Sequence, residues 1–492
     1  MSIIKKITVD TLVIGAGPAG LAAAMELSKA GKSFVVVEKN SSVGGLSKTY
    51  EFKEGDLTFR TDNGPHRFFS KNQYLYGFIE NLIGEQWIEV RRQTRQFIDG
   101  KFYDYPVNAV QAFRNVGPSR VVKMAFDYAV AKIRYGLLRK PVLNFADYVY
   151  ANFGRSLGEF NMINYTEKIW GIPAKEIHID WAGQRIKGLS VASLAKDSVM
   201  KLFHRKNKIG PKTLIDTFNY PDTGTGLIYE TIRVRLQGLG YQILLNTRPT
   251  AVLHSGGKIY KVICIGPDGK IEITCNQLVE SVHMKHFLDL LDPKPSNEIN
   301  EAQKKLRYRS QVYLFITLNK PSVTADQWIY FPNKDIPIGR MSEMRNFSAK
   351  MSPPGKTSLF LEFFCSKGDE TWTMDQDKLF DLAVGHLSRM GFIRPEDVRA
   401  HYVIREEDVY PIYDTSYQEY VGLVKRYLDG FENLYYIGRP GRFRYNNQDH
   451  SLEMGILAAK SIIEGVRYDI EKVGDEKEYY ESGSLRTRQS KN

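Results

Sequence analysis

The chain has 492 residues, of which 42% are hydrophobic and 25% are charged, and its formal net charge is +12. This length predicts two or three domains that share a large core. The positive charge suits a phosphate-rich ligand. The basic residues are dispersed, however, and follow no zinc-finger, RRM or bZIP pattern, which argues against nucleic acid. We interpret the densest basic cluster, at positions 201–208, as a solvated loop.

Membrane-spanning, secreted and disulfide-rich proteins are also disfavoured. No apolar run approaches the roughly 20 residues that a membrane-spanning helix needs, and Met1–Asp10 is too short and too polar for a signal peptide. The cysteines Cys264, Cys275 and Cys365 are scattered without metal-ligand spacing. We therefore expect free thiols, no metal site and a cytoplasmic location.

The N-terminal residues follow the order of a dinucleotide-binding βαβ unit. The strand-like run Thr8–Ile14 leads directly into a GAGPAG turn, and Leu21–Ala30 has a helical composition. Gly15 permits the tight turn, Gly17 lets the backbone approach a pyrophosphate, and Gly20 allows the helix to pack closely on the strand. The start of the helix offers free N–H groups to the phosphates, so contacts are also expected from Pro18 and Ala19.

The second strand and the residues after it indicate which dinucleotide binds. Ser33–Val37 ends in Glu38, whose carboxylate can accept hydrogen bonds from an adenosine ribose and disfavours a 2′-phosphate. A glycine pair follows at Gly44 and Gly45, and this arrangement resembles the two-dinucleotide-domain flavoproteins, including the amine oxidases and protoporphyrinogen oxidases. The resemblance implies that the cofactor is FAD, with further contacts from Lys39, Gly45, Leu46 and Ser47.

We predict an α/β fold, in which a Rossmann-like FAD-binding domain carries a helical insertion and a mixed α+β substrate domain. The FAD-binding domain is expected to be discontinuous, comprising residues 1–100, 216–307 and 426–470. The remaining parts are a helical insertion, a mixed sheet and helix substrate domain, and a charged, disordered tail, at 101–215, 308–425 and 471–492.

Within the insertion, the periodicity of residues 120–138 predicts a basic, amphipathic helix. Such a helix can lie on a membrane surface, but packing in a small bundle is the interpretation that we prefer. A second helix is expected at 190–203.

Several short segments resemble the UDP-galactopyranose mutases. Tyr165–Pro173 (YTEKIWGIP) is similar to a segment of the bacterial enzymes, and Gly438–Ser451 (GRPGRFRYNNQDHS) is similar to a segment of the eukaryotic type. The resemblance extends from Gly15 to about Val466. Three further segments match the family: Gly64–Ser70 (GPHRFFS), Tyr220–Gly226, and Trp328–Pro332 together with Arg340.

These mutases convert a UDP-sugar between its pyranose and furanose rings with reduced FAD and without net redox change. The flavin N5 is the nucleophile that displaces UDP, and covalent catalysis divides one difficult isomerisation into easier steps. The resemblance thus implies a nucleotide-sugar mutase in cell-surface polysaccharide synthesis. No separate NAD(P)H motif is apparent, although an external reductant such as NAD(P)H can enter a flavin pocket transiently.

The resemblance also assigns roles to individual residues. The catalytic set, with two arginines on the diphosphate and three tyrosines lining the pocket, corresponds to His66, Arg185, Tyr330, Arg340, Tyr410, Tyr445 and Asn447. The substrate contacts correspond to Tyr105, Asn108, Trp170, Arg185, Tyr330 and Arg340. The remaining flavin contacts correspond to Gly64, His66, Arg95, Val252, Gly438, Arg439, Asn447, Gln448 and Ser451.

Three departures from the family weaken the substrate assignment more than the cofactor assignment. Val107 and Asn108 replace an aromatic residue and a glutamine that the eukaryotic-type mutases place against the uracil. Pro65 replaces a glycine in the flavin loop, which removes an N–H and fixes φ. The chain between Tyr445 and Asn447 is shorter than in the eukaryotic type. The nucleotide, the sugar and the oligomeric state stay open.

Two other functions compete with the mutase. An FAD-dependent oxidase or desaturase of the protoporphyrinogen oxidase or amine oxidase type would share the FAD domain. It would need an apolar channel and no pair of phosphate-binding arginines, so Arg185 and Arg340 favour the mutase. The second competitor is a non-enzymatic, flavin-binding partner protein or scaffold. Such a protein would not require the whole set of tyrosines and arginines, so their presence argues against it.

Overall fold

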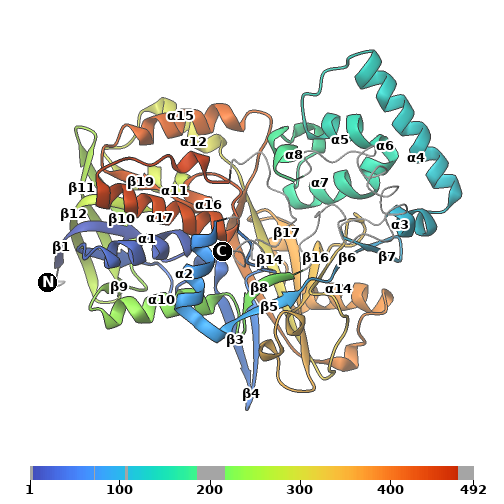
Figure 1. The fold of residues 1–492 in the computed structure, drawn as a ribbon, viewed down its shortest axis with the longest axis horizontal. Helices are drawn as coiled ribbons and strands as arrows, with labels where there is room; N and C mark the ends of the chain where they lie inside the picture. Colours follow the sequence, from blue (N-terminus) through green and yellow to red (C-terminus); the bar gives the residue numbers. More distant parts are fainter. Residues whose placement is uncertain (1–3, 71, 106–108, 186–216, 475–492) are drawn as a thin grey trace, which may run out of the picture.

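The structure, a computed structural model, describes residues 4–70, 72–105, 109–185 and 217–474. It consists of two lobes, each built on one large sheet, and a helical layer beside the second lobe (Figure 1). The predicted helix at 190–203 and the basic cluster at 201–208 lie outside the described residues. Within the described residues, no helix combines the length and the apolar character needed to cross a bilayer.

The first lobe contains an eight-stranded sheet in the order β13-β10-β11-β12-β1-β2-β9, with β19 also paired to β12. Strands β19, β12, β1, β2 and β9 run parallel, whereas β10, β11 and β12 form an antiparallel meander. The strands are β1 (Lys5–Ile14), β2 (Phe34–Val37), β9 (Gln242–Leu244), β10 (Arg248–Ser255), β11 (Lys258–Gly266), β12 (Gly269–Glu280), β13 (Leu291–Asp292) and β19 (Leu434–Tyr436).

Helices cover both faces of this sheet, because its central parallel strands are apolar on both sides. In β1, Leu12, Val13 and Ile14 are all buried. One face is covered by α1 (Pro18–Lys29), α2 (Gln73–Ile83), α10 (Gly226–Gly238) and α17 (Gln448–Glu464). The other face is covered by α11 (Met284–Leu290), α12 (Asn297–Lys305) and α15 (Tyr417–Asp429).

The carboxyl ends of the parallel strands meet at one edge of the first sheet. The GAGPAG turn follows β1, Glu38 follows β2, and Gly438 comes shortly after β19. In open α/β sheets, ligands bind in the crevice beyond these ends. The topology therefore brings together three segments that lie far apart in the sequence.

The second lobe contains a seven-stranded sheet in the order β18-β14-β17-β16-β15-β6-β7. Helix α14 (Gln376–Arg389) and the short α13 (Glu370–Thr373) pack on one face. The other face is aromatic and packs against β3 (Thr49–Glu54), β4 (Leu57–Asp62) and β8 (Thr217–Pro221), of which β8 pairs with β5 (Trp87–Arg91). The strands are β6 (Thr94–Ile98), β7 (Lys101–Asp104), β14 (Tyr308–Leu318), β15 (Trp328–Tyr330), β16 (Arg340–Glu343), β17 (Thr357–Cys365) and β18 (Val398–Pro411).

The helical layer confirms the predicted amphipathic helix at 120–138, which forms α4 and the π-helical η3, and α4 packs against α5 and α6. Figure 1 shows this layer as the teal elements at the upper right. Its members are α3 (Ala109–Val116), α4 (Pro118–Ala131), η3 (Lys132–Leu137), α5 (Phe145–Phe153), α6 (Arg155–Leu157), η4 (Gly158–Ile163), α7 (Asn164–Trp170) and α8 (Asp180–Arg185).

The structure departs from three predicted boundaries. Strand β6 lies within the segment 1–100 assigned to the FAD-binding domain, yet it pairs with β15 of the second sheet. A strand's composition reveals its propensity but not its partner. The tail expected to be disordered from 471 begins inside the turn η9 (Ile470–Lys472), where Val473 is buried and Glu471 pairs with Lys425 at 2.6 Å. Helix α15, whose residues up to 425 were assigned to the substrate domain, covers the first sheet. The other domain boundaries stay predictions.

Candidate active site

The GAGPAG turn makes the tight connection that a dinucleotide unit requires. Gly15 has a φ of +96°, a left-handed conformation that favours glycine. A Cβ on Gly20 would lie 1.9 Å from the carbonyl oxygen of Gly15, so no side chain fits there. Gly17 is the N-cap of α1, and Pro18 takes the first helical position, which needs no N–H donor. The first turn of α1 therefore presents its N–H groups at the carboxyl edge of the sheet.

Glu38 and the second glycine motif lie around this turn. The Glu38 carboxylate accepts hydrogen bonds from the backbone N–H of Ala16 at 2.8 Å and of Asn40 at 2.9 Å. A Cβ on Gly45 would lie 3.3 Å from the Cα of Gly17, so the two glycine motifs approach backbone to backbone. Of the other predicted contacts of this segment, Leu46 and Ser47 belong to the short helix η1 (Gly45–Ser47), and Lys39, which follows Glu38, is exposed.

The C-terminal segment closes the other side of this cradle. A Cβ on Gly438, at the start of α16 (Gly438–Gly441), would lie 3.3 Å from the Cβ of Ala19. Helix α17 packs so closely on α1 that a Cβ on Gly455 would lie 2.0 Å from the carbonyl oxygen of Ala19. The predicted flavin contacts of α17 lie at its start: Asn447 as the N-cap, Gln448 and Ser451.

The cradle fits a flavin nucleotide. Within the described residues, both amide atoms of Asn63, Nδ1 of His66 and one carboxylate oxygen of Asp449 are buried without a hydrogen-bond partner. Buried polar groups in native proteins are nearly always paired. A flavin ring carries carbonyl oxygens and ring nitrogens that match such donors and acceptors.

One row of side chains crosses the second sheet in register. Tyr330 on β15 lies opposite Arg340 on β16, which in turn lies opposite Glu362 on β17. Gln96 on β6 and Tyr313 on β14 extend the row at its two ends. Residues directly opposite each other share one face of a sheet, and Tyr330 and Tyr313 belong to the aromatic face. The sequence did not single out Gln96, Tyr313 or Glu362, because their places in the row depend on strand register.

Arg340 is held by Glu362. Its Nε and Nη2 donate to the two carboxylate oxygens at 2.5 and 2.7 Å. The exposed fraction of the side chain is 17% for Arg340 and 1% for Glu362. Although burial opposes the charged form, Glu362 raises the pKa of Arg340, so the guanidinium stays protonated. This bidentate pair orients Arg340 and leaves the Nη1 donors without a hydrogen bond among the described residues.

Two stacked tyrosines form the neighbouring wall. Tyr410, at the end of β18, stacks on Tyr445 with ring centroids 5.5 Å apart. The Arg439 guanidinium lies 5.1 Å from the ring centre of Tyr410 and 5.0 Å from that of Tyr445. Trp170 supports Tyr410 from behind in an edge-to-face contact at 6.2 Å. Arg439, expected on an FAD phosphate, thus lies among the tyrosines, where it donates to the carbonyl of Asn446 at 3.0 Å.

His66 is close to both arginines. Burial lowers the pKa of His66 to about 3, and the positive charges of Arg439 and Arg340 lower it as well. The imidazole is therefore neutral at pH 7. Gly64, two residues before His66, has a φ of +115°. The backbone N–H of His66 donates to the Gly64 carbonyl at 2.9 Å. Tyr165, a residue without a predicted role, joins this cluster of arginines and tyrosines. Its ring makes an edge-to-face contact with Tyr330, with ring centroids 5.3 Å apart.

Lys168 in the YTEK segment positions the strands that carry Tyr330 and Arg340. Its Nζ donates to the carbonyls of Phe331, Asn333 and Ile336 at 2.5, 2.6 and 2.8 Å, all in the loop between β15 and β16. Burial lowers the pKa of Lys168 to about 7. An uncharged amine has two donors, so three carbonyl acceptors favour the ammonium form. Helix α7 therefore fixes the loop that joins the two site strands.

Some predicted residues lie apart from this cluster. Arg95, expected beside the flavin ring, pairs with Asp326 at 2.7 Å, and its guanidinium lies 4.0 Å from the ring centre of Phe102. Its neighbour Gln96 lies in the site row, and successive residues of a strand point to opposite faces. Arg95 therefore belongs to the far face of the sheet.

The remaining predicted residues are placed as follows. Tyr105 contacts Tyr330 with ring centroids 5.2 Å apart, and Val252 is buried in β10. Asn108 lies outside the described residues, as does the side chain of Arg185 at the end of α8.

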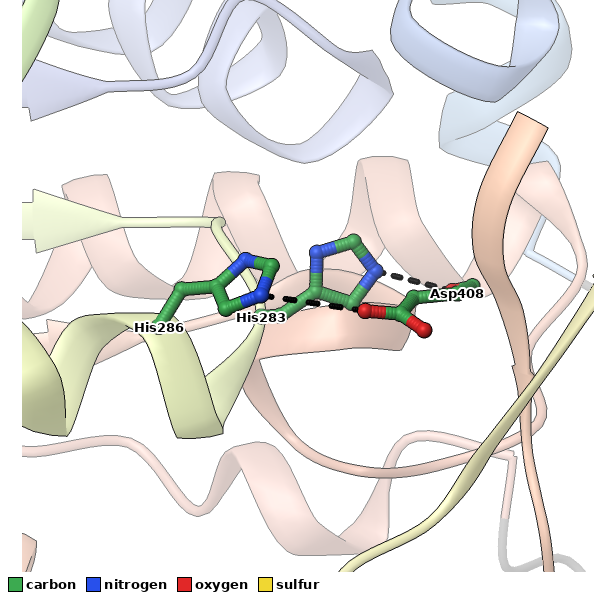
Figure 2. A group of neighbouring side chains, drawn as sticks. All are labelled: His283, His286 and Asp408. Carbon is green, nitrogen blue, oxygen red and sulfur yellow. Dashed lines mark hydrogen bonds and ion pairs between the residues drawn. The ribbon is translucent and has the colours of Figure 1, made fainter. Parts of the chain in front are cut away.

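His283, His286 and Asp408 bridge the two lobes (Figure 2). Nε2 of His283, the N-cap of α11, lies 2.8 Å from the carbonyl oxygen of Asp408 on β18, and Nε2 of His286 lies 3.7 Å from the Asp408 carboxylate. Within the described part of the chain, this is the one group with metal-ligand spacing, its ligand atoms lying within 4.8 Å of one another. The absence of a metal site stays a prediction.

The glycine turn, the glutamate after β2 and the cradle at the carboxyl edge define a flavin-nucleotide-binding protein with a second, substrate-side sheet. The family of flavin containing amine oxidoreductases matches residues 18–439, and this chain belongs to that family. It is an FAD enzyme, as the sequence predicted.

Solved structures confirm the predicted fold class. A reduced UDP-galactopyranose mutase superposes with a TM-score of 0.79 at 22% identity, covering 96% of this chain and 97% of that one. A putative protoporphyrinogen oxidase from Exiguobacterium sp. 255-15 superposes with a TM-score of 0.68 at 16% identity, covering 95% and 99%.

Curated relatives match shorter parts of the chain. A lycopene-forming phytoene desaturase from Pantoea ananas is 24% identical over 330 residues, which is 63% of each protein. A soluble pyridine nucleotide transhydrogenase from Vibrio atlanticus is 32% identical over 111 residues. The match spans 21% of that protein's length, about a fifth.

Proposed function

We propose that this FAD enzyme is a nucleotide-sugar mutase, which interconverts the pyranose and furanose forms of a UDP-sugar or a related nucleotide sugar without net redox change. The observation that supports this most is the contact of Tyr330 with Arg340 and of Arg439 with Tyr410 and Tyr445. Similarity to a UDP-galactopyranose mutase over nearly the whole chain gives further support.

The cluster suits a diphosphate. Nη1 of Arg340 and the guanidinium of Arg439 would meet the phosphate oxygens, with Arg185 as the further phosphate arginine that the resemblance implies. Burial raises the pKa of Tyr165 and Tyr410, so their hydroxyls stay protonated at neutral pH and can donate to an anion. Because His66 is neutral, it adds no charge to the pocket and can orient a hydroxyl or a ring atom.

The cofactor cradle serves the same reaction. Bound FAD, when reduced, supplies the nucleophile for the anomeric carbon of the sugar. Asn447, Gln448 and Ser451 would hold the flavin, and the GAGPAG turn and Glu38 would hold the pyrophosphate and the ribose. An external reductant such as NAD(P)H would keep the flavin reduced in a cytoplasmic enzyme of cell-surface polysaccharide synthesis.

An FAD-dependent oxidase or desaturase is the second candidate, and Glu362 is the observation that favours it. Because Glu362 neutralises Arg340, the pair attracts a diphosphate less strongly than a lone arginine would. The aromatic wall of Tyr105, Tyr165 and Tyr330 also suits an apolar substrate, and the similarity to phytoene desaturase covers 63% of the chain.

The two functions are separated by one anaerobic experiment. Purified holoenzyme is reduced with dithionite and incubated with UDP-galactofuranose, and UDP-galactopyranose is quantified by chromatography. We expect conversion with reduced enzyme and none with oxidised enzyme. Absence of conversion, together with oxygen consumption or desaturation in the presence of a porphyrinogen, an amine or a carotenoid, would establish the second candidate instead.

A further inference from the structure

The outer surface of the helical layer carries an unusual concentration of exposed apolar side chains. Within the described residues, sixteen large hydrophobic side chains are exposed, and seven of them lie between Val122 and Leu143. Five are spaced by three or four residues, which places them along one side of a continuous helix. We call these five the apolar stripe: Val122 (69% exposed), Phe126 (67%), Val130 (44%), Ile133 (53%) and Leu137 (77%).

Contacts on the opposite side of the helix fix the direction of the apolar stripe. Asp127 accepts a hydrogen bond from the N–H of Ser156 at 3.1 Å, and Tyr135 donates to Asp147 at 2.7 Å. Lys132 donates to the carbonyl of Ala151 at 3.0 Å. These contacts hold α4 and η3 against α5 and α6, so the stripe faces away from the bundle. Figure 1 shows α4 at the outer edge of the molecule, away from both sheets.

The charges on the helix that carries the apolar stripe are mostly positive, and only Arg120 and Lys140 among its cations form ion pairs within the described residues, with Asp99 and Asp147. Residues 118–140 contain six cations, Arg120, Lys123, Lys132, Arg134, Arg139 and Lys140, and a single acid, Asp127, which is turned inward. Within the part of the chain that the structure describes, Lys123, Arg134 and Arg139 are exposed and form no ion pair. A second copy of this surface would bring like charges together, whereas an anionic lipid surface complements both the apolar stripe and the cations.

We propose that α4 and η3 dock this enzyme on an anionic lipid surface, with the apolar stripe inserted at the level of the headgroups and the cations over the lipid phosphates. The helix lies in the plane of the interface and does not cross the bilayer. This docking is independent of the reaction proposed above. The same helical layer also presents Tyr165 and Lys168, through α7, to the substrate-side sheet.

The test uses holoenzyme and large vesicles of phosphatidylcholine, with or without phosphatidylglycerol, in a sedimentation assay. Wild type should bind the vesicles that contain phosphatidylglycerol. Phe126→Ser/Leu137→Ser should weaken this binding by about a hundredfold, because two large side chains no longer enter the lipid. Val234→Ser/Leu239→Ser is the matched control, since these side chains are 59% and 62% exposed on another part of the surface. The control should bind like wild type.

A charge variant tests the second half of the proposal. Arg134→Glu/Arg139→Glu should weaken binding to phosphatidylglycerol vesicles by at least about tenfold and reduce its dependence on salt. Flavin absorbance and circular dichroism show that each variant is folded. Failure of wild type to bind anionic vesicles, or equal binding by the stripe variant, would overturn the proposal. A wild-type dimer that dissociates in the stripe variant without lipid would also overturn it, because a second copy would then cover the stripe.

Discussion

The two halves of the candidate site are built in different ways. The cofactor cradle is made mostly of backbone: Gly15, Gly17 and Gly45 let main chains approach each other, and the start of α1 offers its N–H groups. The substrate-side cluster is made of side chains, such as Arg340, that strand register and ion pairs hold in place. The cradle should therefore be sensitive to added bulk, and the cluster to the loss of orienting partners. Variants can test this difference. Those in the cradle should lose cofactor binding, whereas those in the cluster should keep the cofactor and lose turnover.

The largest effect is expected in the cradle. A Cβ on Gly17 would lie 3.9 Å from the Cα of Gly45, so alanine fits, but the branched side chain of Gly17→Val would fill the space between the two glycine motifs. We expect a folded apoprotein whose affinity for FAD is reduced at least about a thousandfold, or about 4 kcal/mol. Flavin absorbance and FAD titration measure this, with Gly17→Ala as the milder control. A yellow Gly17→Val protein would contradict the backbone description of the cradle.

The cluster should lose turnover and keep its flavin. Arg340→Ala removes a cation from the pocket and leaves the buried Glu362 unpaired, so we expect turnover to fall at least about a hundredfold and stability to fall by about 3 kcal/mol. Arg95→Ala is a matched control, because Arg95 also pairs with a buried carboxylate, Asp326, on the other face of the same sheet.

The control separates chemistry from stability. Arg95→Ala should be destabilised to a similar degree, yet retain turnover. The double variant Arg340→Met/Glu362→Gln should recover much of the stability, because no unpaired charge stays buried, and remain inactive. Thermal unfolding and the conversion assay measure the two effects. If Arg95→Ala lost as much turnover as Arg340→Ala, the loss would come from reduced stability and not from the position of Arg340 on the site face of the sheet.

A smaller effect is expected at Lys168, which acts on the cluster through the loop between β15 and β16. Lys168→Met removes the hydrogen bonds to the carbonyls of Phe331, Asn333 and Ile336. We expect a loss of about 2 kcal/mol of stability and a KM raised about tenfold, with FAD retained. Lys334→Met is the control, since Lys334 is 60% exposed and its ammonium group pairs with Glu167 at the surface. A change in kcat without a change in KM would argue against a positioning role.

The sequence was sufficient for the cradle because its determinants are local. A strand, a glycine turn and a helix follow one another, and Gly15 and Gly20 are required by φ and by close approach, whatever the rest of the chain does. The cluster depends on register. Motif similarity selected Tyr330 and Arg340, but Glu362 and Gln96 enter the site only because β6, β15, β16 and β17 pair with these offsets.

Arg95 also shows that the sequence alone does not reveal which side chains enter the site. It is adjacent to Gln96 in the sequence, and one residue decides which face of a strand a side chain occupies. In the helical layer, periodicity alone correctly predicted the amphipathic helix, and only the structure shows that its apolar stripe stays exposed after the bundle has formed.

The last effect concerns pH. It compares His66 of the cluster with His283, which contacts Asp408 where the two lobes meet. Burial, with Arg439 and Arg340, lowers the pKa of His66 to about 3, and burial lowers that of His283 to about 4. An unfolded histidine titrates near pH 6.5, so between these values the unfolded chain binds more protons and stability falls as the pH is lowered. His66→Gln should therefore lose about 2 kcal/mol less than wild type between pH 7 and pH 5.

The two histidines should differ in their response to the neighbouring cations. Arg340→Met/Glu362→Gln removes a positive charge that lowers the pKa of His66, so the contribution of His66 to acid sensitivity should shrink in this background. The contribution of His283, which faces Asp408 and His286, should not change. A change in a folded pKa near 3 or 4 affects stability only below about pH 5, so thermal unfolding of the histidine variants in both backgrounds, at pH 5 and pH 3, measures these contributions. An equal change at both histidines would mean that the arginines act through overall stability, and that His66 does not sense the charges of the cluster.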